Sequence, residues 1–222
     1  MQRRARKEAD KTARRRAILD AARTEFSRGS YGALTMTAVA GRAGLVKGTL
    51  YLYFETKEEL LLELFEELLG EWLDEVERRL GDPRGAWDAE RVADALSRSL
   101  EGREALTRLI TVVGGVLEHN IGDDRARRFK RALHARVTRG GALLAQRLPR
   151  LGADGAVRLL FQVYALLTGF GEMAYPAPVV RRVIEEPGLE LFRVDVVREV
   201  SAAVLALLKG APGRARATPR DR

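Results

Sequence analysis

The sequence predicts an all-α protein of about nine helices, in which a three-helix head at the N-terminus joins a larger helical body. Apolar residues recur at spacings of three and four along most of the 222 residues, which is the period of one helix face. No alternating apolar pattern is long enough to indicate a sheet, and Gly, Pro and capping residues separate the apolar segments. A chain of this length can bury a sizeable core.

The head is predicted to contain one long helix followed by two short ones. The first helix is expected over about 11–28. Thr35 is a natural N-cap for a short helix over 35–43, which Gly44 stops. A second short helix is expected over 47–54, after only three linking residues. Two short helices joined in this way have the dimensions of a helix-turn-helix.

The body is expected to begin with a long helix that Thr56 caps, and Asp88 is a natural cap for the next one. Its helices are expected over 57–80, 88–101, 123–148, 154–174, 178–186 and 193–209. A glycine-broken apolar stretch lies between 102 and 122, and its pair Gly114-Gly115 indicates a kink or a close backbone contact. Such a kink could open a cavity between helices, or it could let two helices touch.

Positive charge is concentrated at the N-terminus. Residues 1–57 carry thirteen Lys and Arg against five Asp and Glu, an excess equal to the net +8 of the whole chain. This asymmetry favours a small polyanion-binding module on a mildly acidic body. The alternative for the first residues is a solvated, disordered arm. We therefore predict a basic disordered arm at 1–11, a DNA-binding domain at 12–57, a regulatory and dimerisation domain at 58–209 and a disordered basic tail at 210–222.

Composition excludes several other classes of protein. The chain has no cysteine and two histidines, which leaves no disulfide and little material for a metal site, so no metal and no cofactor is expected. No run of about 18 uncharged apolar residues is present, and the basic start is no signal peptide. A cytoplasmic protein without a membrane segment is expected. An enzyme is not, because the sequence has no phosphate-binding glycine loop, no HExxH motif and no Ser/His/Asp arrangement.

The second short helix of the head has an unusual outer face. At 100° per residue, Leu50 and Phe54 fall together and should face the core of the head. Gly48 and Leu52 then point away from that core, where a surface helix normally carries charge. In a major groove this face would suit its surroundings, because Gly48 lets the backbone approach base edges and Leu52 can meet a thymine methyl group.

Hydrogen-bond donors surround this face. Lys47 has the reach to contact a guanine or a phosphate. Tyr51 and Tyr53 could bind phosphates through their hydroxyls, or they could belong to a packed aromatic cluster. The other donors that would suit phosphate oxygens are Thr37, Thr49 and Lys57.

Four segments in order carry a resemblance to a known family: Gly29–Thr35 (GSYGALT), Val39–Gly44 (VAGRAG), Lys47–Phe54 (KGTLYLYF) and Lys57–Leu60 (KEEL). Over roughly 12–65, the chain resembles the TetR (tetracycline repressor) family of transcriptional regulators. The resemblance implies a two-fold dimer that binds a palindromic operator, usually represses transcription, and is released by a small ligand in its C-terminal domain. By the family pattern Lys47, Gly48, Thr49 and Leu52 would face bases, and Thr35, Thr37, Tyr51, Tyr53 and Lys57 would face phosphates.

Two positions of the head depart from favourable helix chemistry. Val46 stands where family members commonly have a serine, so the second short helix lacks a side-chain N-cap, whose replacement by Ala costs about 0.5–2 kcal/mol. Gly41 weakens the preceding helix by about 1 kcal/mol relative to Ala. Both residues indicate a head that is only marginally stable alone and becomes more ordered on DNA. Neither of them replaces a predicted contact residue.

Apolar residues of the body supply candidates for a ligand pocket and for a dimer interface. A pocket for an apolar or aromatic ligand would use Leu109, Val113, Leu117, Phe129, Leu133, Val137, Phe170 and Met173. The last two long helices could form a four-helix interface through Leu160, Val163, Leu167, Val197, Val200, Val204 and Leu208. In both cases the alternative is ordinary core.

These observations predict a homodimeric repressor that leaves a palindromic operator in double-stranded DNA when a small apolar or aromatic effector binds. A non-specific architectural DNA-binding protein without ligand response is the alternative. It predicts steep salt dependence and little sequence preference.

Overall fold

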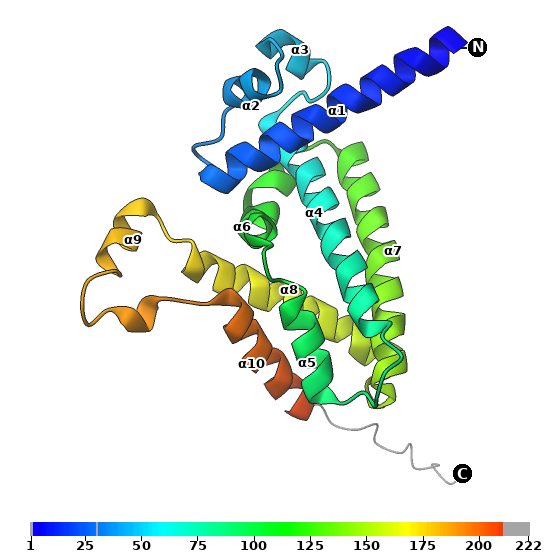
Figure 1. The fold of residues 1–222 in the computed structure, drawn as a ribbon, viewed down its shortest axis with the longest axis vertical. Helices are drawn as coiled ribbons and strands as arrows, with labels where there is room; N and C mark the ends of the chain where they lie inside the picture. Colours follow the sequence, from blue (N-terminus) through cyan, green and yellow to red (C-terminus); the bar gives the residue numbers. More distant parts are fainter. Residues whose placement is uncertain (1, 30, 211–222) are drawn as a thin grey trace. The chain divides into compact units, whose positions relative to one another are not determined.

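The computed structural model describes residues 2–29 and 31–210, and this part of the chain contains ten α-helices and no strand (Figure 1). The α-helices are α1 (Gln2–Arg28), α2 (Met36–Arg42), α3 (Lys47–Tyr51), α4 (Lys57–Leu80), α5 (Ala89–Arg98), α6 (Glu104–Val112), α7 (Asp123–Arg147), α8 (Gly152–Ala174), α9 (Pro178–Val183) and α10 (Val196–Gly210). A π-helical turn η1 (Val113–Leu117) and the short 3-10 turns η2 (Glu118–Asn120), η3 (Pro149–Leu151) and η4 (Glu190–Phe192) lie between them. The predicted all-α fold is confirmed.

The first helix is longer than the sequence indicated. We expected it to begin near Lys11, at the end of a disordered arm at 1–11, but α1 begins at Gln2. The segment 2–16 is rich in Arg, Ala and Lys, which have high intrinsic helix propensity, and this propensity extends the helix beyond the part that packs. Of the tail expected at 210–222, Gly210 closes α10 and the rest lies outside the described residues.

The Gly114-Gly115 pair lies inside the π-helical turn η1. Both glycines are exposed, and a Cβ added at either would meet no atom within 4 Å. Of the two alternatives that the sequence left open at this kink, the close contact of two helices is not found at these glycines. A π turn inserts an extra residue into a helix, and two residues without side chains relax the local backbone constraint at the insertion.

The described chain divides into two compact units by packing. Unit 1 contains the residues up to Leu69 together with Glu104–Phe129, and unit 2 contains Gly70–Arg103 together with the residues from Lys130 onward. α4 and α7 each contribute residues to both units. Because these units are defined by packing alone, the predicted domain boundary at residues 57 and 58 stays a prediction.

Unit 1 is built around one face of α1 and the first half of α4. Ile18, Ala22 and Phe26 of α1 are buried, as their predicted stripe requires. Phe65 and Phe129 meet edge to face with ring centroids 6.1 Å apart, which is a favoured aromatic geometry. Arg108 of α6 donates to the carbonyl oxygen of Gly29 at 3.3 Å, which holds the end of α1 against α6.

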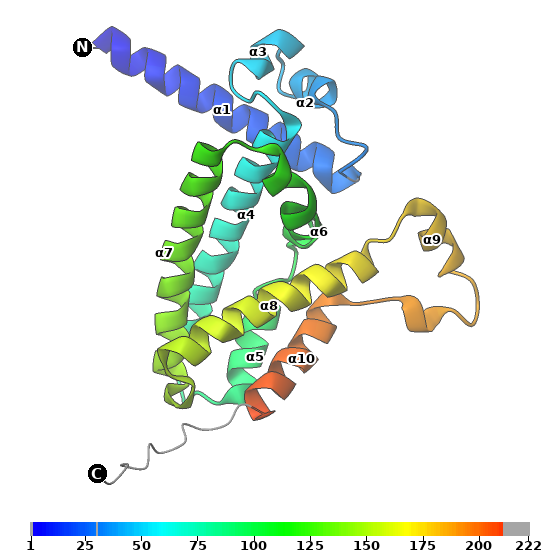
Figure 2. The ribbon, with the colours of Figure 1, turned by 180° about the vertical axis from the view of Figure 1, so that it is seen from behind.

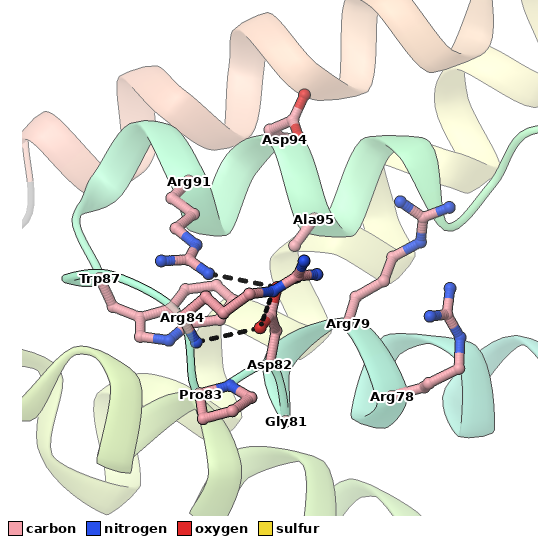
Figure 3. A pocket seen from close by; sticks show the side chains of 10 residues that line it. All are labelled: Arg78, Arg79, Gly81, Asp82, Pro83, Arg84, Trp87, Arg91, Asp94 and Ala95. Carbon is pink, nitrogen blue, oxygen red and sulfur yellow. Dashed lines mark hydrogen bonds and ion pairs between the residues drawn. The ribbon is translucent and has the colours of Figure 1, made fainter.

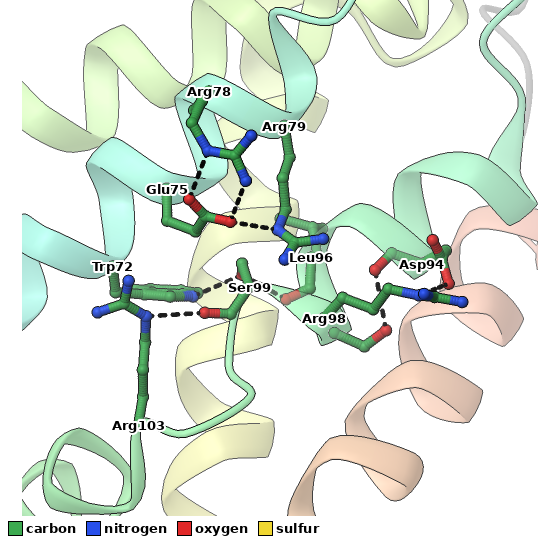
Figure 4. Close-up of polar contacts among 10 residues, drawn as sticks. Trp72, Glu75, Arg78, Arg79, Asp94, Leu96, Arg98, Ser99 and Arg103 are labelled. Carbon is green, nitrogen blue, oxygen red and sulfur yellow. Dashed lines mark hydrogen bonds and ion pairs between the residues drawn. The ribbon is translucent and has the colours of Figure 1, made fainter.

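Unit 2 packs α10 against both α5 and α8 (Figures 1 and 2). A chain of hydrogen bonds joins α4 to the end of α5 (Figure 4). Trp72 Nε1 donates to the hydroxyl of Ser99 at 2.8 Å, and that hydroxyl donates to the carbonyl oxygen of Leu96 at 2.6 Å. Trp72 and Ser99 are both buried, and the indole N–H of Trp72 depends on the Ser99 hydroxyl as its acceptor.

Ser99→Ala is expected to destabilise the protein by about 1–3 kcal/mol, because it leaves the buried indole N–H of Trp72 without an acceptor. Urea unfolding followed by tryptophan fluorescence measures this loss. Ser97→Ala is the matched control: Ser97 is also buried in α5 but donates only to the carbonyl of Asp94 within its own helix. Equal losses in the two variants would contradict the role of the Trp72 contact.

The segment between α8 and α10 stands out from the ends of these helices (Figures 1 and 2). We call residues 175–195, which contain α9 and η4, the arm. None of its residues is buried in the described structure. Arg193 nevertheless fixes its shape by donating to the carbonyl oxygens of Ile184 and Glu185 at 3.0 and 2.9 Å. The arm is therefore ordered without a core of its own.

Candidate nucleic-acid interface

The two short helices of the head are set by local capping and turn chemistry. Thr35 is the N-cap of α2, as predicted, and its side chain accepts from the backbone N–H of Ala38 at 3.2 Å. After α2 the chain turns at Gly44, whose φ of +69° is a left-handed conformation that favours glycine. The backbone N–H of Leu45 then bonds to the carbonyl of Ala40 at 2.9 Å, which closes the helix end and directs the chain into α3.

The orientation of α3 agrees with the helical spacing in the sequence. Leu50 and Phe54 are 0% and 2% exposed and anchor the helix in the core of unit 1. On the opposite side, Leu52 is 81% exposed, and a Cβ added at Gly48 would meet no atom within 4 Å. The outer face of this helix is thus uncharged, open and partly without side chains.

Val46 is the N-cap of α3 and makes no side-chain capping hydrogen bond, as its apolar side chain requires. It is 74% exposed, although valine is strongly apolar. α3 is also shorter than expected, since regular helix ends at Tyr51 and Leu52 is its C-cap. The short, uncapped helix is held by Leu50 and Phe54 rather than by its own ends.

The nine predicted contact residues all reach the surface in the structure. Thr35, Thr37, Lys47, Gly48, Tyr51 and Leu52 are exposed, and Thr49, Tyr53 and Lys57 are half-buried. Because Tyr51 is 41% exposed, it is not part of a closed aromatic cluster. Lys57 is the most engaged of the nine: its ammonium lies 3.8 Å from the centroid of the Tyr31 ring and donates to the Tyr31 carbonyl at 3.0 Å. Contact with DNA by these residues stays a prediction.

Arg15 positions the head, a role that the sequence analysis missed. Its guanidinium lies 4.4 Å from the centroid of the Phe54 ring and donates to the carbonyl of Tyr53 at 3.2 Å. It also forms a two-pronged ion pair with Glu63 of α4. One arginine of α1 therefore joins the end of the α3 segment to α4. Because the partners lie 38 to 48 residues away in the sequence, no local pattern could have revealed the contact.

A second link joins the loop before α2 to α4. The hydroxyl group of Tyr31 donates a hydrogen bond to the carboxylate of Glu58. This hydrogen bond, with smaller contributions from burial and from the charge of Glu58, raises the pKa of Tyr31 from 10.0 to about 12. The protonated phenol is therefore the form that the folded head favours.

Tyr31→Phe is expected to destabilise the protein by about 1 kcal/mol at neutral pH, through loss of this hydrogen bond. Because the folded-state pKa is raised, the contribution of Tyr31 is fully present below pH 10.0 and disappears as the pH rises through about 12. Urea unfolding of both proteins at several pH values measures the difference. A stability difference between the two proteins that grows between these pH values would contradict the assignment.

The predicted dimer residues have another role in the structure. Leu160, Val163, Leu167, Val200, Val204 and Leu208 are all buried within a single chain, and Val197 is half-buried. The apolar face of α10 is covered by α5 and α8 of the same chain, so the alternative of internal core is the correct one for the buried six. A residue already sealed inside one protomer cannot contact a partner.

The predicted ligand residues fall into two groups. Leu109, Val113, Leu117 and Phe129 are buried in unit 1. In unit 2, Leu133, Val137 and Phe170 are half-buried, and Met173 is 55% exposed. Burial alone does not distinguish a pocket wall from ordinary core, so this set stays a prediction.

Two further classes of site find no support among the residues that the structure describes. No group of three or more His, Cys, Asp or Glu side chains in residues 2–29 and 31–210 is arranged to hold a metal ion. None of the helices described there combines the length and the apolar character that a membrane span requires.

An exposed helix set by a tight turn on a three-helix head defines a helix-turn-helix protein. Comparison with family models identifies the family of helix-turn-helix proteins to which the chain belongs. The model "Bacterial regulatory proteins, tetR family" matches residues 18–64, and the model "Tetracyclin repressor-like, C-terminal domain" matches residues 66–215. The chain belongs to the TetR family of transcriptional regulators, which is a family of regulators rather than of enzymes.

Similar curated proteins match mainly in the head. The "Fatty acid metabolism regulator protein" of Bacillus subtilis (strain 168) is 37% identical over 60 residues, which are 27% of this chain and 31% of that protein. The "HTH-type transcriptional repressor KstR" of Rhodococcus jostii (strain RHA1) is 35% identical over 101 residues, 44% of this chain and 46% of that protein. The matched regions thus span less than half the length of either relative.

Solved structures are similar over most of the chain. The fatty acid degradation regulator FadR from Bacillus halodurans has 22% identity and a TM-score of 0.58, covering 90% of this chain and 97% of that one. FadR from Bacillus subtilis in complex with stearoyl-CoA has 21% identity and a TM-score of 0.50, covering 87% and 97%. At these identities the likeness shows the fold.

Proposed function

We propose that this regulator is a dimeric repressor that binds a palindromic operator and is released from it by a small apolar ligand. The proposal depends above all on the outer face of α3, where Gly48 and Leu52 are open to solvent while Leu50 and Phe54 hold the helix in place. An uncharged face with one glycine is poorly explained by solubility. It is well suited to base edges and thymine methyl groups in a major groove.

Two heads are needed because one short helix reads only a few base pairs. A two-fold pair reaches half-sites about 34–36 Å apart, or a multiple of that distance. In place of the residues that are buried in the protomer, we propose that the partner covers exposed apolar side chains of unit 2. These are Phe161, Tyr164 and Met173 of α8 and Val179, Val180, Val183, Leu191 and Phe192 of the arm.

An apolar effector is supported by the chemistry of the predicted ligand residues, which are aliphatic or aromatic apart from one thioether. The names of two similar proteins, a fatty acid metabolism regulator and FadR bound to stearoyl-CoA, make an acyl chain the first effector to test. To change operator occupancy from 99:1 to 1:99, the ligand must discriminate between two conformations by about 5.5 kcal/mol. We propose α4, which belongs to both units, as the lever.

The sequence-reading role of α3 is tested by selecting operators from a random pool of duplex DNA and then measuring the Leu52→Ala variant. We expect about tenfold weaker binding to the selected operator, since apolar base contacts are lost. Binding to unrelated duplex DNA and the slope of affinity against salt should both stay unchanged, because leucine neutralises no phosphate. An equal, small effect on both DNAs would favour the architectural alternative.

Ligand response is tested separately by gel shift on the selected operator with stearoyl-CoA and with free stearate. Release of the operator by either compound at concentrations that leave the folded protein intact supports the proposal. The matched control is the same titration on unrelated duplex DNA, where a detergent-like effect would appear equally. Operator affinity that no acyl compound changes would contradict an acyl effector.

A further inference from the structure

A cleft in unit 2 carries charge that neither DNA binding nor an apolar effector requires (Figure 3). It has a volume of about 580 Å³ and lies at the turn between α4 and α5. Arg78 and Arg79 from the end of α4 and Arg84 from the turn line it, together with Arg91 of α5. The carboxylates in its wall are Asp82 and Asp94.

The ion pairs of the cleft leave an excess of positive charge. Asp82 accepts from Arg84 at 3.0 and 3.1 Å and pairs with Arg91 at 3.5 Å. Glu75 likewise serves both Arg78 and Arg79, and Asp94 pairs with Arg98. Asp82 and Glu75 therefore serve all four arginines that line the cleft. Each guanidinium has five N–H donors in a planar fork, so these two carboxylates can accept only a fraction of the donors.

Arg91 is fixed in position before any ligand arrives. Its guanidinium lies 4.2 Å from the centroid of the Trp87 ring and donates to the carbonyl of Ala86 at 3.0 Å. Arg147 lies 5.2 Å from the same ring centroid. A guanidinium held by stacking and by a backbone acceptor loses little side-chain entropy on binding an anion.

The indole nitrogen of Trp87, a residue that lines the cleft, supplies an independent sign of a missing partner. It is buried and donates to no acceptor among the residues that the structure describes. Such a buried donor without an acceptor is destabilising unless a ligand or water satisfies it. The surplus of donors that is open to the cleft consists of the guanidinium groups.

We propose that this cleft binds a small phosphate-bearing molecule, with Arg84 and Arg91 as its principal contacts. Arginine forks match two oxygens of a phosphate group, and a second phosphate would reach Arg78 or Arg79 on the opposite wall. Asp82 then competes with the ligand for Arg84 and Arg91. The Arg84 guanidinium and backbone N–H lower the pKa of Asp82 to about 2, so this competitor is charged at neutral pH.

Isothermal titration of the full chain with pyrophosphate tests the site, and citrate distinguishes phosphate geometry from charge alone. We expect one pyrophosphate per chain and weaker binding of citrate. Arg91→Met and the highly exposed Arg84→Met should each weaken binding about tenfold, through loss of a two-pronged contact. Asp82→Asn should tighten it, because a competing negative charge is removed. Arg198→Met, which changes an exposed ion-paired arginine of α10, is the matched control and should bind like wild type.

Three results would overturn the proposal: no heat with pyrophosphate, wild-type affinity in Arg84→Met, or equal losses in Arg84→Met and Arg198→Met. Because Arg84 is 88% exposed, its variant cannot fail merely by unfolding. Equal affinity for citrate and pyrophosphate would replace the phosphate assignment by a general anion site. None of these results depends on operator binding, so the outcome is separate from the proposed function.

Discussion

Gly48→Ala is expected to stabilise the free protein and to weaken binding to the selected operator, two effects of opposite sign. Alanine is favoured over glycine in a helix by up to about 1 kcal/mol, and the new methyl group would meet no atom within 4 Å. On DNA the same methyl group would lie between the α3 backbone and the base edges. We expect the affinity for the operator to fall at least about tenfold, which corresponds to about 1.4 kcal/mol. Urea unfolding and a gel shift measure the two effects.

Gly41→Ala is the matched control for this prediction. Gly41 is also an exposed helical glycine of the head with no atom within 4 Å of an added Cβ, but it lies in α2, outside the predicted base-facing set. It should gain similar stability and keep its affinity for the operator. If both variants gained stability and both bound the operator like wild type, the outer face of α3 would not approach bases closely.

The head could be predicted from sequence because its rules are local. Thr35 and Thr56 are polar caps with their helices directly after them, and both side chains accept the expected backbone hydrogen bonds. Leu50 and Phe54 are one helical turn apart, so their common burial followed from the period alone. Each of these features follows from neighbouring residues alone, whichever distant segment provides the rest of the core.

Contacts between distant segments could not be predicted in this way. The ion pair of Arg15 with Glu63 and the hydrogen bond of Trp72 with Ser99 join residues 48 and 27 positions apart. Both Arg15 and Ser99 are of types that occur mostly on surfaces, so their composition gave no signal. Their roles depend on how α1, α4 and α5 meet, and that is a property of the whole fold.

Six of the seven predicted dimer residues are buried within their own protomer for a related physical reason. The sequence of α10 shows a wide apolar face, and such a face must be covered, but periodicity does not say by which chain. In the structure, α5 and α8 of the same protomer cover it. The sequence of the arm, which is short and interrupted by Pro and Gly, shows no continuous apolar face that would predict an interface. In the structure, however, its apolar residues Leu191 and Phe192 are 87% and 55% exposed. An exposed cluster of this kind is typical of a surface that binds another molecule.

Leu167→Ala and Phe192→Ser should therefore have contrasting effects. Leu167 is fully buried in α8, so its truncation should cost about 2–5 kcal/mol of unfolding free energy while the folded protein stays dimeric. Phe192→Ser should shift the protein towards monomer and leave the unfolding free energy of the protomer nearly unchanged, because a side chain of the arm supports no core of its own chain. Sedimentation at several protein concentrations measures the oligomeric state of each variant, and urea unfolding measures its unfolding free energy.

The concentration dependence separates core from interface without further assumptions. A residue inside one protomer changes the unfolding free energy equally at every protein concentration, whereas an interface residue acts through mass action, so its effect on stability grows as the protein concentration rises above the dissociation constant of the dimer and disappears on dilution to monomer. If Leu167→Ala dissociated the dimer and Phe192→Ser did not, α8 would meet the partner through the side that the structure buries. The packing of α10 onto α5 and α8 would then have to open when two chains assemble.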